Sequence, residues 1–166
     1  MFATGFPAEA AWVFLIPLVP IWLYVAFVDV TTLKIRNWVV ILIAAIFVIG
    51  GPFLLETSYY VTQLIQGAVM LAIMFALFLI RAMGGGDAKF IAAAALYFDR
   101  SDYALLLMLL AVCFLVCYLL HRVAKVAGGK RLAPNWASWY SGKRFPMGLP
   151  LGAWLVSYLA LAAGVL

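Results

Sequence analysis

Two aspartates are the strongest candidates for chemistry, because each lies where a hydrophobic segment meets basic residues. Asp87 follows the glycine run Gly84 to Gly86 and precedes Lys89, and Asp29 ends the first long apolar stretch. An ionised side chain is costly in a bilayer, so it marks a candidate functional site. Glycine lacks a Cβ atom and lets another backbone approach closely. Asp87 is therefore predicted to be a catalytic or transport carboxylate in a wet cleft; the alternative is a cytosolic turn with a solvated Asp87–Lys89 pair.

A pair of carboxylates at one membrane depth has the groups needed to hydrolyse a peptide bond. One ionised carboxylate takes a proton from water, while its protonated neighbour donates a hydrogen bond to the scissile carbonyl. Two like charges close together do not both ionise easily, so such a pair shares one proton. We predict that Asp29 and Asp87 form this pair, with Asp87 ionised at a helix N-terminus and Asp29 holding the proton near the C-terminal end of the first helix. If that helix continues past Asp29, Lys34 and Arg36 would favour the opposite assignment. The alternative is that Asp29 pairs with Lys34 or Arg36, and Asp87 with Lys89.

The composition predicts a helical membrane protein. Of the 166 residues, 69% are hydrophobic and only 10% are charged, which is too apolar for a soluble domain. Residues 1–28 contain no Lys or Arg, so they lack the basic start of a signal peptide and are predicted to be a mature helix. We expect one all-α domain over residues 1–166, a six-transmembrane-helix bundle. Apolar windows predict long spans near 10–28, 38–55, 60–82, 103–121 and 147–166.

The sixth predicted crossing, 88–98, is short. Eleven helical residues cover only about 16 Å of a hydrocarbon core about 30 Å thick. Three explanations are open: the helix starts below the membrane surface, the glycine run lengthens it, or neighbouring helices shelter it. All three place Asp87 at the edge of the membrane.

The basic residues predict the orientation. With six crossings, ten of the eleven Lys and Arg residues fall on one side, which the positive-inside rule makes cytosolic. Both termini are then expected on the non-cytosolic side. Asp29 and Asp87 share the basic side, whereas the other four acids lie opposite. The ten bases are Lys34, Arg36, Arg81, Lys89, Arg122, Lys125, Lys130, Arg131, Lys143 and Arg144.

The predicted loop 122–144 carries six of these bases, with aromatic residues between them. Trp136, Trp139 and Tyr140 are the aromatic residues. A basic loop with interfacial aromatic side chains is typical of contact with anionic lipid headgroups. We therefore predict lipid contact here in preference to contact with a basic substrate. No folded basic surface is indicated, so nucleic acid is not an expected partner.

Three short motifs occur in the order 29–37, 84–89 and 145–152. Gly84 to Asp87 reads Gly-Gly-Gly-Asp, with a lysine two residues later. This stretch resembles the GxGD signature of the membrane-embedded aspartyl peptidases, and the spacing of the lysine resembles their type IV prepilin peptidase branch. Residues 145–152 resemble the Pro-x-Gly-x-Pro opening of that branch's last helix.

The stretch from Asp29 to Asn37 resembles the first-aspartate motif of the same branch. In that motif the aspartate precedes an Ile-Pro-Asn triplet, and here Arg36 replaces the proline. The resemblance implies a bacterial inner-membrane endopeptidase that cuts the basic leader from prepilins or pseudopilins at the cytosolic face. It implies that Asp29 and Asp87 are the catalytic pair. The residues that support the motifs are Gly84, Gly86, Lys89 and Asn37.

The cysteines point to the short members of that family. Larger members carry a zinc-binding cytosolic domain with two CxxC pairs and also methylate the new N-terminus. This sequence has only Cys113 and Cys117, which are predicted to be packing residues, and no CxxC pair. It therefore resembles the short peptidase-only members that serve Flp (tight-adherence) pili, or archaeal preflagellin peptidases. We expect no methyltransferase activity, no metal and no other cofactor.

Two other functions stay open. In a small ion- or proton-coupled transporter, Asp29 and Asp87 would bind a cation or proton. That function would favour more polar residues inside the spans than this sequence has. A non-catalytic pilus assembly subunit is the other alternative.

Overall fold

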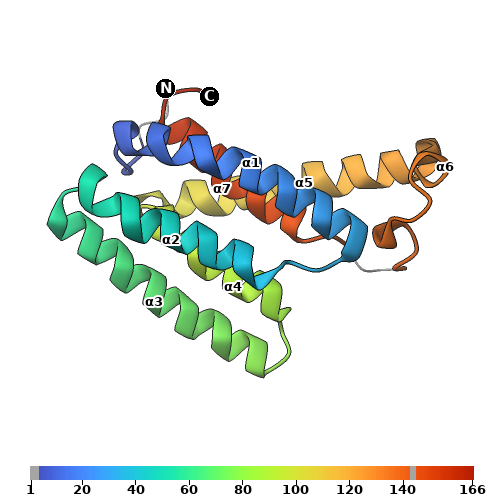
Figure 1. Cartoon of the computed structure of the whole chain (residues 1–166), viewed down its shortest axis with the longest axis horizontal. Coiled ribbons are helices and arrows are strands. Elements are labelled where there is room, and N and C mark those ends of the chain that lie inside the picture. Colours follow the sequence, from blue (N-terminus) through green and yellow to red (C-terminus); the bar gives the residue numbers. More distant parts are fainter. Residues whose placement is uncertain (1–3, 143–144) are drawn as a thin grey trace.

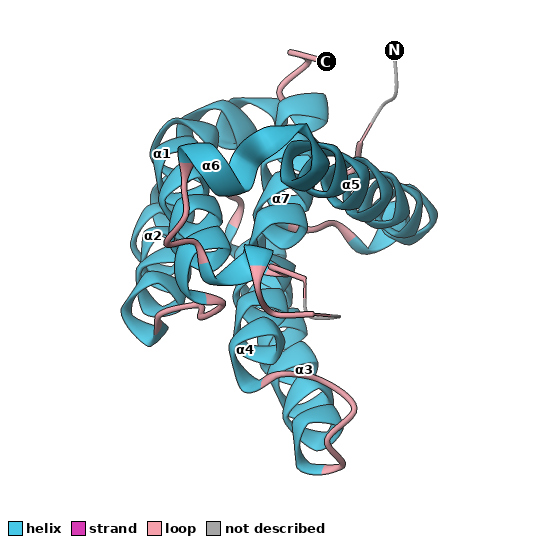
Figure 2. Ribbon diagram, turned by 90° about the vertical axis from the view of Figure 1, so that its right-hand side faces the viewer, coloured by secondary structure: helices cyan, strands magenta, loops and turns pink. Residues whose placement is uncertain are grey.

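The protein is a bundle of helices in a computed structural model that describes residues 4–142 and 145–166 (Figure 1). These described residues contain no strand, so the predicted all-α class is confirmed (Figure 2). The α-helices are α1 (Ala8–Thr32), α2 (Asn37–Leu54), α3 (Thr57–Leu79), α4 (Gly85–Ala94), α5 (Tyr103–Ala124), α6 (Lys130–Leu132) and α7 (Gly148–Ala162).

The protein is a polytopic membrane protein. Within the described ranges, four helical stretches are long and apolar enough to cross a bilayer: α1, α2, α3 and Arg100–Leu132, which contains α5 and α6. The apolar helix α7 is shorter, with 15 residues, and Gly164 follows it in a left-handed conformation (φ 71°) that ends helices. Because α4 and α7 are both shorter than a full crossing, six crossings stay a prediction.

Helix α1 is longer than predicted at both ends. It begins at Ala8 and continues to Thr32, beyond the predicted range 10–28. Leu33 then adopts a left-handed conformation (φ 55°), and its amide donates to the Asp29 carbonyl oxygen at 2.8 Å. Asp29 therefore lies in the last turn of the helix rather than beyond it.

The short segment predicted at 88–98 is an internal helix held by α3. It starts earlier than predicted, at Gly85 in the glycine run, and a 3₁₀ turn, Ala95–Tyr97, extends it. The Gln66 side-chain amide donates to the Ala95 and Phe98 carbonyl oxygens at 2.8 Å, and Gln63 donates to Phe98 at 2.8 Å. Protein side chains thus satisfy carbonyl groups that a short helix would otherwise leave bare in lipid. Two of the three explanations therefore apply: the glycine run lengthens the helix, and the neighbouring helix α3 shelters its end.

Helix α7 lies among α1, α4 and α5 (Figure 2). Near the C-terminal end of α7, the Tyr158 hydroxyl donates to the Asp102 carboxylate at 2.7 Å. The Gly5 amide donates to the same carboxylate at 2.8 Å. The start of the described chain and the last helix are therefore joined through one buried aspartate.

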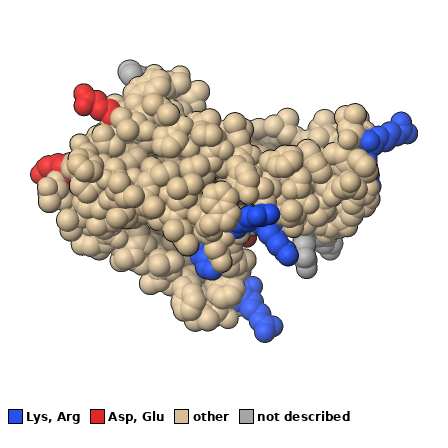
Figure 3. All heavy atoms as spheres, viewed as in Figure 1, with Lys and Arg blue, Asp and Glu red and all other residues tan. Residues whose placement is uncertain are grey.

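The chain between α5 and α7 is partly helical. Helix α5 is followed by Lys125–Gly129, where Gly128 adopts a left-handed conformation (φ 99°) that kinks the chain before α6. The rings of Trp136 and Trp139 stack at 5.5 Å. Two of the bases predicted to contact lipid, Lys143 and Arg144, lie outside the described residues. Figure 3 shows acidic side chains at the left end of the molecule and basic ones at its right end and lower side.

Candidate active site

Asp29 is enclosed where α1 meets the start of α7. Its side chain is only 4% exposed, although it is a carboxylate. The Gly148 amide, the first of α7, donates to Asp29 Oδ2 at 2.5 Å. The first amides of a helix have no partner within the helix, and the helix dipole favours negative charge there. The N-terminus of α7 therefore supplies a partner for an otherwise isolated buried acid.

Gly148 provides this contact because it has no side chain. A Cβ atom at this position would lie 2.9 Å from Val25 Cγ1 and 3.1 Å from Asp29 Oδ2. The neighbouring contacts hold α7 in the same register, since the Trp22 indole donates to the Leu149 carbonyl oxygen at 3.2 Å. The approach of α7 to the last two turns of α1 thus depends on a glycine.

Asp87 lies in the first turn of α4 and is half-buried. Its carboxylate folds back over the glycine run, so a Cβ atom on Gly84 would lie 2.7 Å from Asp87 Oδ2. None of the described residues donates a hydrogen bond to this carboxylate. Asp87 is therefore held at the N-terminus of one helix, and Asp29 beside the N-terminus of another.

The two aspartate motifs touch each other. Gly86 faces Ile35, in the connection between α1 and α2, where a Cβ atom on Gly86 would lie 3.3 Å from Ile35 Cβ. The Lys89 ammonium donates to Asn37 Oδ1 at 3.2 Å. The turn that carries Asp87 therefore packs against the chain that follows Asp29, through Gly86, Lys89 and Asn37.

The alternative pairing of each aspartate with a nearby base is not what the structure contains. Asp29 bonds to the α7 amide, and Lys89 bonds to Asn37. Neither carboxylate forms an ion pair with Lys34, Arg36 or Lys89, all of which are described. Among the residues that the structure describes, neither carboxylate has a neutralising base; Asp29 is enclosed and Asp87 is half-buried.

Sequence reasoning did not identify Gly148 as a partner of Asp29. The motif 145–152 was visible, but only as the opening of a helix. Nothing in the spacing of 119 residues between Gly148 and Asp29 links the two. The signal that was available is the glycine itself between two prolines, Pro146 and Pro150, because glycine at a helix start permits a close approach.

Comparison with known proteins identifies one family. A model of the type IV leader peptidase family matches residues 16–120, which include both aspartates and both of their motifs. No curated protein and no solved structure matches the chain.

Proposed function

Because the chain belongs to the type IV leader peptidase family, a family of bacterial inner-membrane peptidases, we propose that it is an aspartic endopeptidase that removes the basic leader from Flp-type prepilins or pseudopilins at the cytosolic membrane face. One observation carries the proposal. The Asp29 and GxGD motifs lie far apart in the sequence, yet they touch through Gly86 with Ile35 and Lys89 with Asn37.

The two carboxylates divide the work according to their surroundings. Asp87 is half-open and accepts no hydrogen bond from the described residues, so it is free to hold a water molecule and remove its proton. Asp29 Oδ2 is occupied by the Gly148 amide. Its other oxygen carries the shared proton and donates it toward the scissile carbonyl.

The reaction needs no covalent intermediate. Hydroxide oxygen adds to the carbonyl carbon as Asp87 takes the water proton. The carbon–nitrogen bond then breaks, and the leaving amine takes a proton from the carboxyl pair. One water is consumed, the leader leaves with a new carboxyl group, and the mature chain has a free amine. The pair returns to its starting state with one shared proton.

Further parts of the proposal concern the setting of the site. We place six crossings in the membrane, with both termini on the non-cytosolic side and the basic residues facing the cytosol. The bases of 122–144 contact anionic lipid headgroups, with the exposed Tyr140 at the interface. Trp139 is buried against His121 and does not take part in this contact. The activity is peptidase only, without N-methylation.

Substitution of each aspartate tests the function. Asp29→Asn and Asp87→Asn remove the ionisable groups with little change of shape, and each is expected to abolish cleavage of a co-expressed Flp-type prepilin, read as the loss of the shorter band on a gel. Glu9→Gln, an exposed acid in α1, is the matched control and should cleave normally. Cleavage by both aspartate variants would overturn the proposal.

Purification separates the peptidase from a non-catalytic assembly subunit. The purified wild-type protein in detergent should cleave the prepilin without any other protein. A protein that binds the prepilin but never cleaves it would be an assembly subunit.

A further inference from the structure

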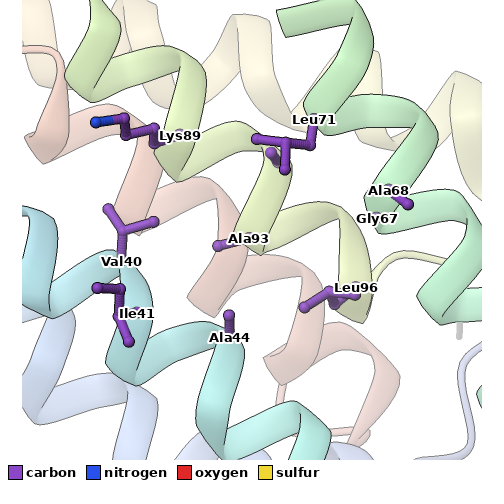
Figure 4. A pocket seen from close by; sticks show the side chains of 10 residues that line it. Val40, Ile41, Ala44, Gly67, Ala68, Leu71, Lys89, Ala93 and Leu96 are labelled. Carbon is purple, nitrogen blue, oxygen red and sulfur yellow. The ribbon is translucent and has the colours of Figure 1, made fainter. Parts of the chain in front are cut away.

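An apolar groove lies between α2 and α3, with α4 as its floor (Figure 4). The groove has a volume of about 380 Å³. Ala44 of α2 and Ala68 of α3 stand on opposite walls, and Ala92 and Ala93 of α4 lie between them. Because these side chains are small, the backbone of another helix can approach closely here.

The groove exists because α2 and α3 meet only near their connection. There the Tyr60 ring stacks on Phe47 at 5.8 Å, and its hydroxyl donates to the Val48 carbonyl oxygen at 3.0 Å. Toward the other end of the bundle α4 lies between the two helices and keeps them apart (Figure 1). The opening faces lipid, since Ile41 and Leu71 at its rim are 67% and 51% exposed.

The groove leads to the proposed catalytic site. A second hollow of about 210 Å³ shares Leu71 and Lys89 with the first and extends to Gly85 and Phe78. Gly85 begins α4, two residues before Asp87. The two hollows therefore form one apolar path along α4, from Leu96 to the first turn that carries the candidate carboxylate.

We propose that this path holds the hydrophobic helix of the prepilin during cleavage, an inference that rests on the proposed function. A basic leader does not fit, because Lys89 is the one charged residue among the described lining residues. An apolar helix that enters from the bilayer matches the apolar residues that line the groove. It also lies at the same depth in the membrane as the groove. The N-terminal end of the prepilin helix then lies beside Asp87. The peptide bond just before that helix therefore reaches the carboxylate pair.

Filling the groove tests the inference. Ala68 is exposed on the α3 wall, so Ala68→Trp places an indole in the path without entering the core. Cleavage of the membrane-inserted prepilin should fall by about tenfold or more, because an overfilled interface loses that much affinity. Ala111→Trp is the matched control, since Ala111 is exposed on α5, which contributes no residue to the groove. It should cleave like the wild type.

Photo-cross-linking gives a readout that does not depend on cleavage. A photoreactive phenylalanine analogue is placed at 68 or at 111 in the Asp87→Asn protein, together with an Flp-type prepilin. A cross-link from 68 into the prepilin's hydrophobic helix, with none from 111, supports the groove.

The outcomes separate the two proposals. A wild-type enzyme that cleaves, with normal cleavage by Ala68→Trp and no preference for 68 in cross-linking, would overturn the groove and leave the peptidase intact. The groove would then hold lipid only. A wild-type protein that does not cleave the prepilin would overturn the proposed function, whatever the groove binds.

Discussion

The contact between Gly148 and Asp29 is the most sensitive point of the proposed site, and Gly148→Ala tests it. The added Cβ atom would lie 2.9 Å from Val25 Cγ1, 3.1 Å from Asp29 Oδ2 and 3.2 Å from Asp29 Cβ. Ordinary contacts between such atoms are longer by several tenths of an ångström, so α7 and the carboxylate must move apart. That movement stretches the only hydrogen bond that a described residue gives to the Asp29 carboxylate.

The expected effect on catalysis exceeds the effect on stability. Overfilling a well-packed site costs about 1–3 kcal/mol of folding free energy. Misplacing a catalytic group by about 1 Å can lower the rate about a hundredfold. We therefore expect Gly148→Ala to insert and to unfold only slightly earlier, while its cleavage rate falls between about tenfold and a hundredfold. The rate is measured with purified enzyme and prepilin in detergent, and stability by thermal unfolding of the same sample.

Gly50→Ala is the matched control. Gly50 is also a helical glycine in tight contact, because a Cβ atom there would lie 3.0 Å from the Phe14 ring. That ring belongs to the aromatic core and does not touch either aspartate. Gly50→Ala should change stability by an amount similar to Gly148→Ala but keep its activity. Equal rates for both variants and the wild type would refute the role given to Gly148.

Two further substitutions test the shelter of α4 and the link between the motifs. Gln66→Leu removes the side-chain donor of the Ala95 carbonyl and one donor of the Phe98 carbonyl, so we expect thermal unfolding to show a loss of about 1–3 kcal/mol; an unchanged melting temperature would show that α4 does not need this shelter. Lys89→Met breaks the bond to Asn37 and should lower cleavage about tenfold. Asn37→Ala should do the same, and the double variant should be no slower than either single one; additive losses would show that the two residues act separately.

The helix dipoles around the site act on both aspartates. Both lie beside helix N-termini, Asp87 in the first turn of α4 and Asp29 against the first amide of α7. The sequence suggested that Asp29, near the end of its own helix, would feel an unfavourable dipole. The structure adds a second helix whose opposite end faces the carboxylate, which offsets that effect.

Much of the protein could be predicted from local sequence. Long apolar windows predicted the four described helical stretches that are long enough to cross a membrane. The distribution of Lys and Arg residues along the chain predicted that both aspartates share the basic side. The glycine run next to Asp87 indicated a close approach, which the structure shows at Ile35. These features depend on residues that are close in the sequence. Their physical causes are the burial of apolar surface and the cost of charge in lipid, and both can be judged within a single helix.

The remaining features depend on which helices lie side by side, and no local pattern contains that information. The end of the short segment is held by α3, because Gln63 and Gln66 donate to the Ala95 and Phe98 carbonyl oxygens that follow α4. Likewise, the pairing of Asp29 with Gly148 and the opening of the groove beside Ala68 follow from the packing of α7 on α1 and of α4 between α2 and α3. Sequence alone determined which groups could react; only the tertiary structure decided what surrounds them, because a hydrogen bond across 119 residues forms only when two helices pack together.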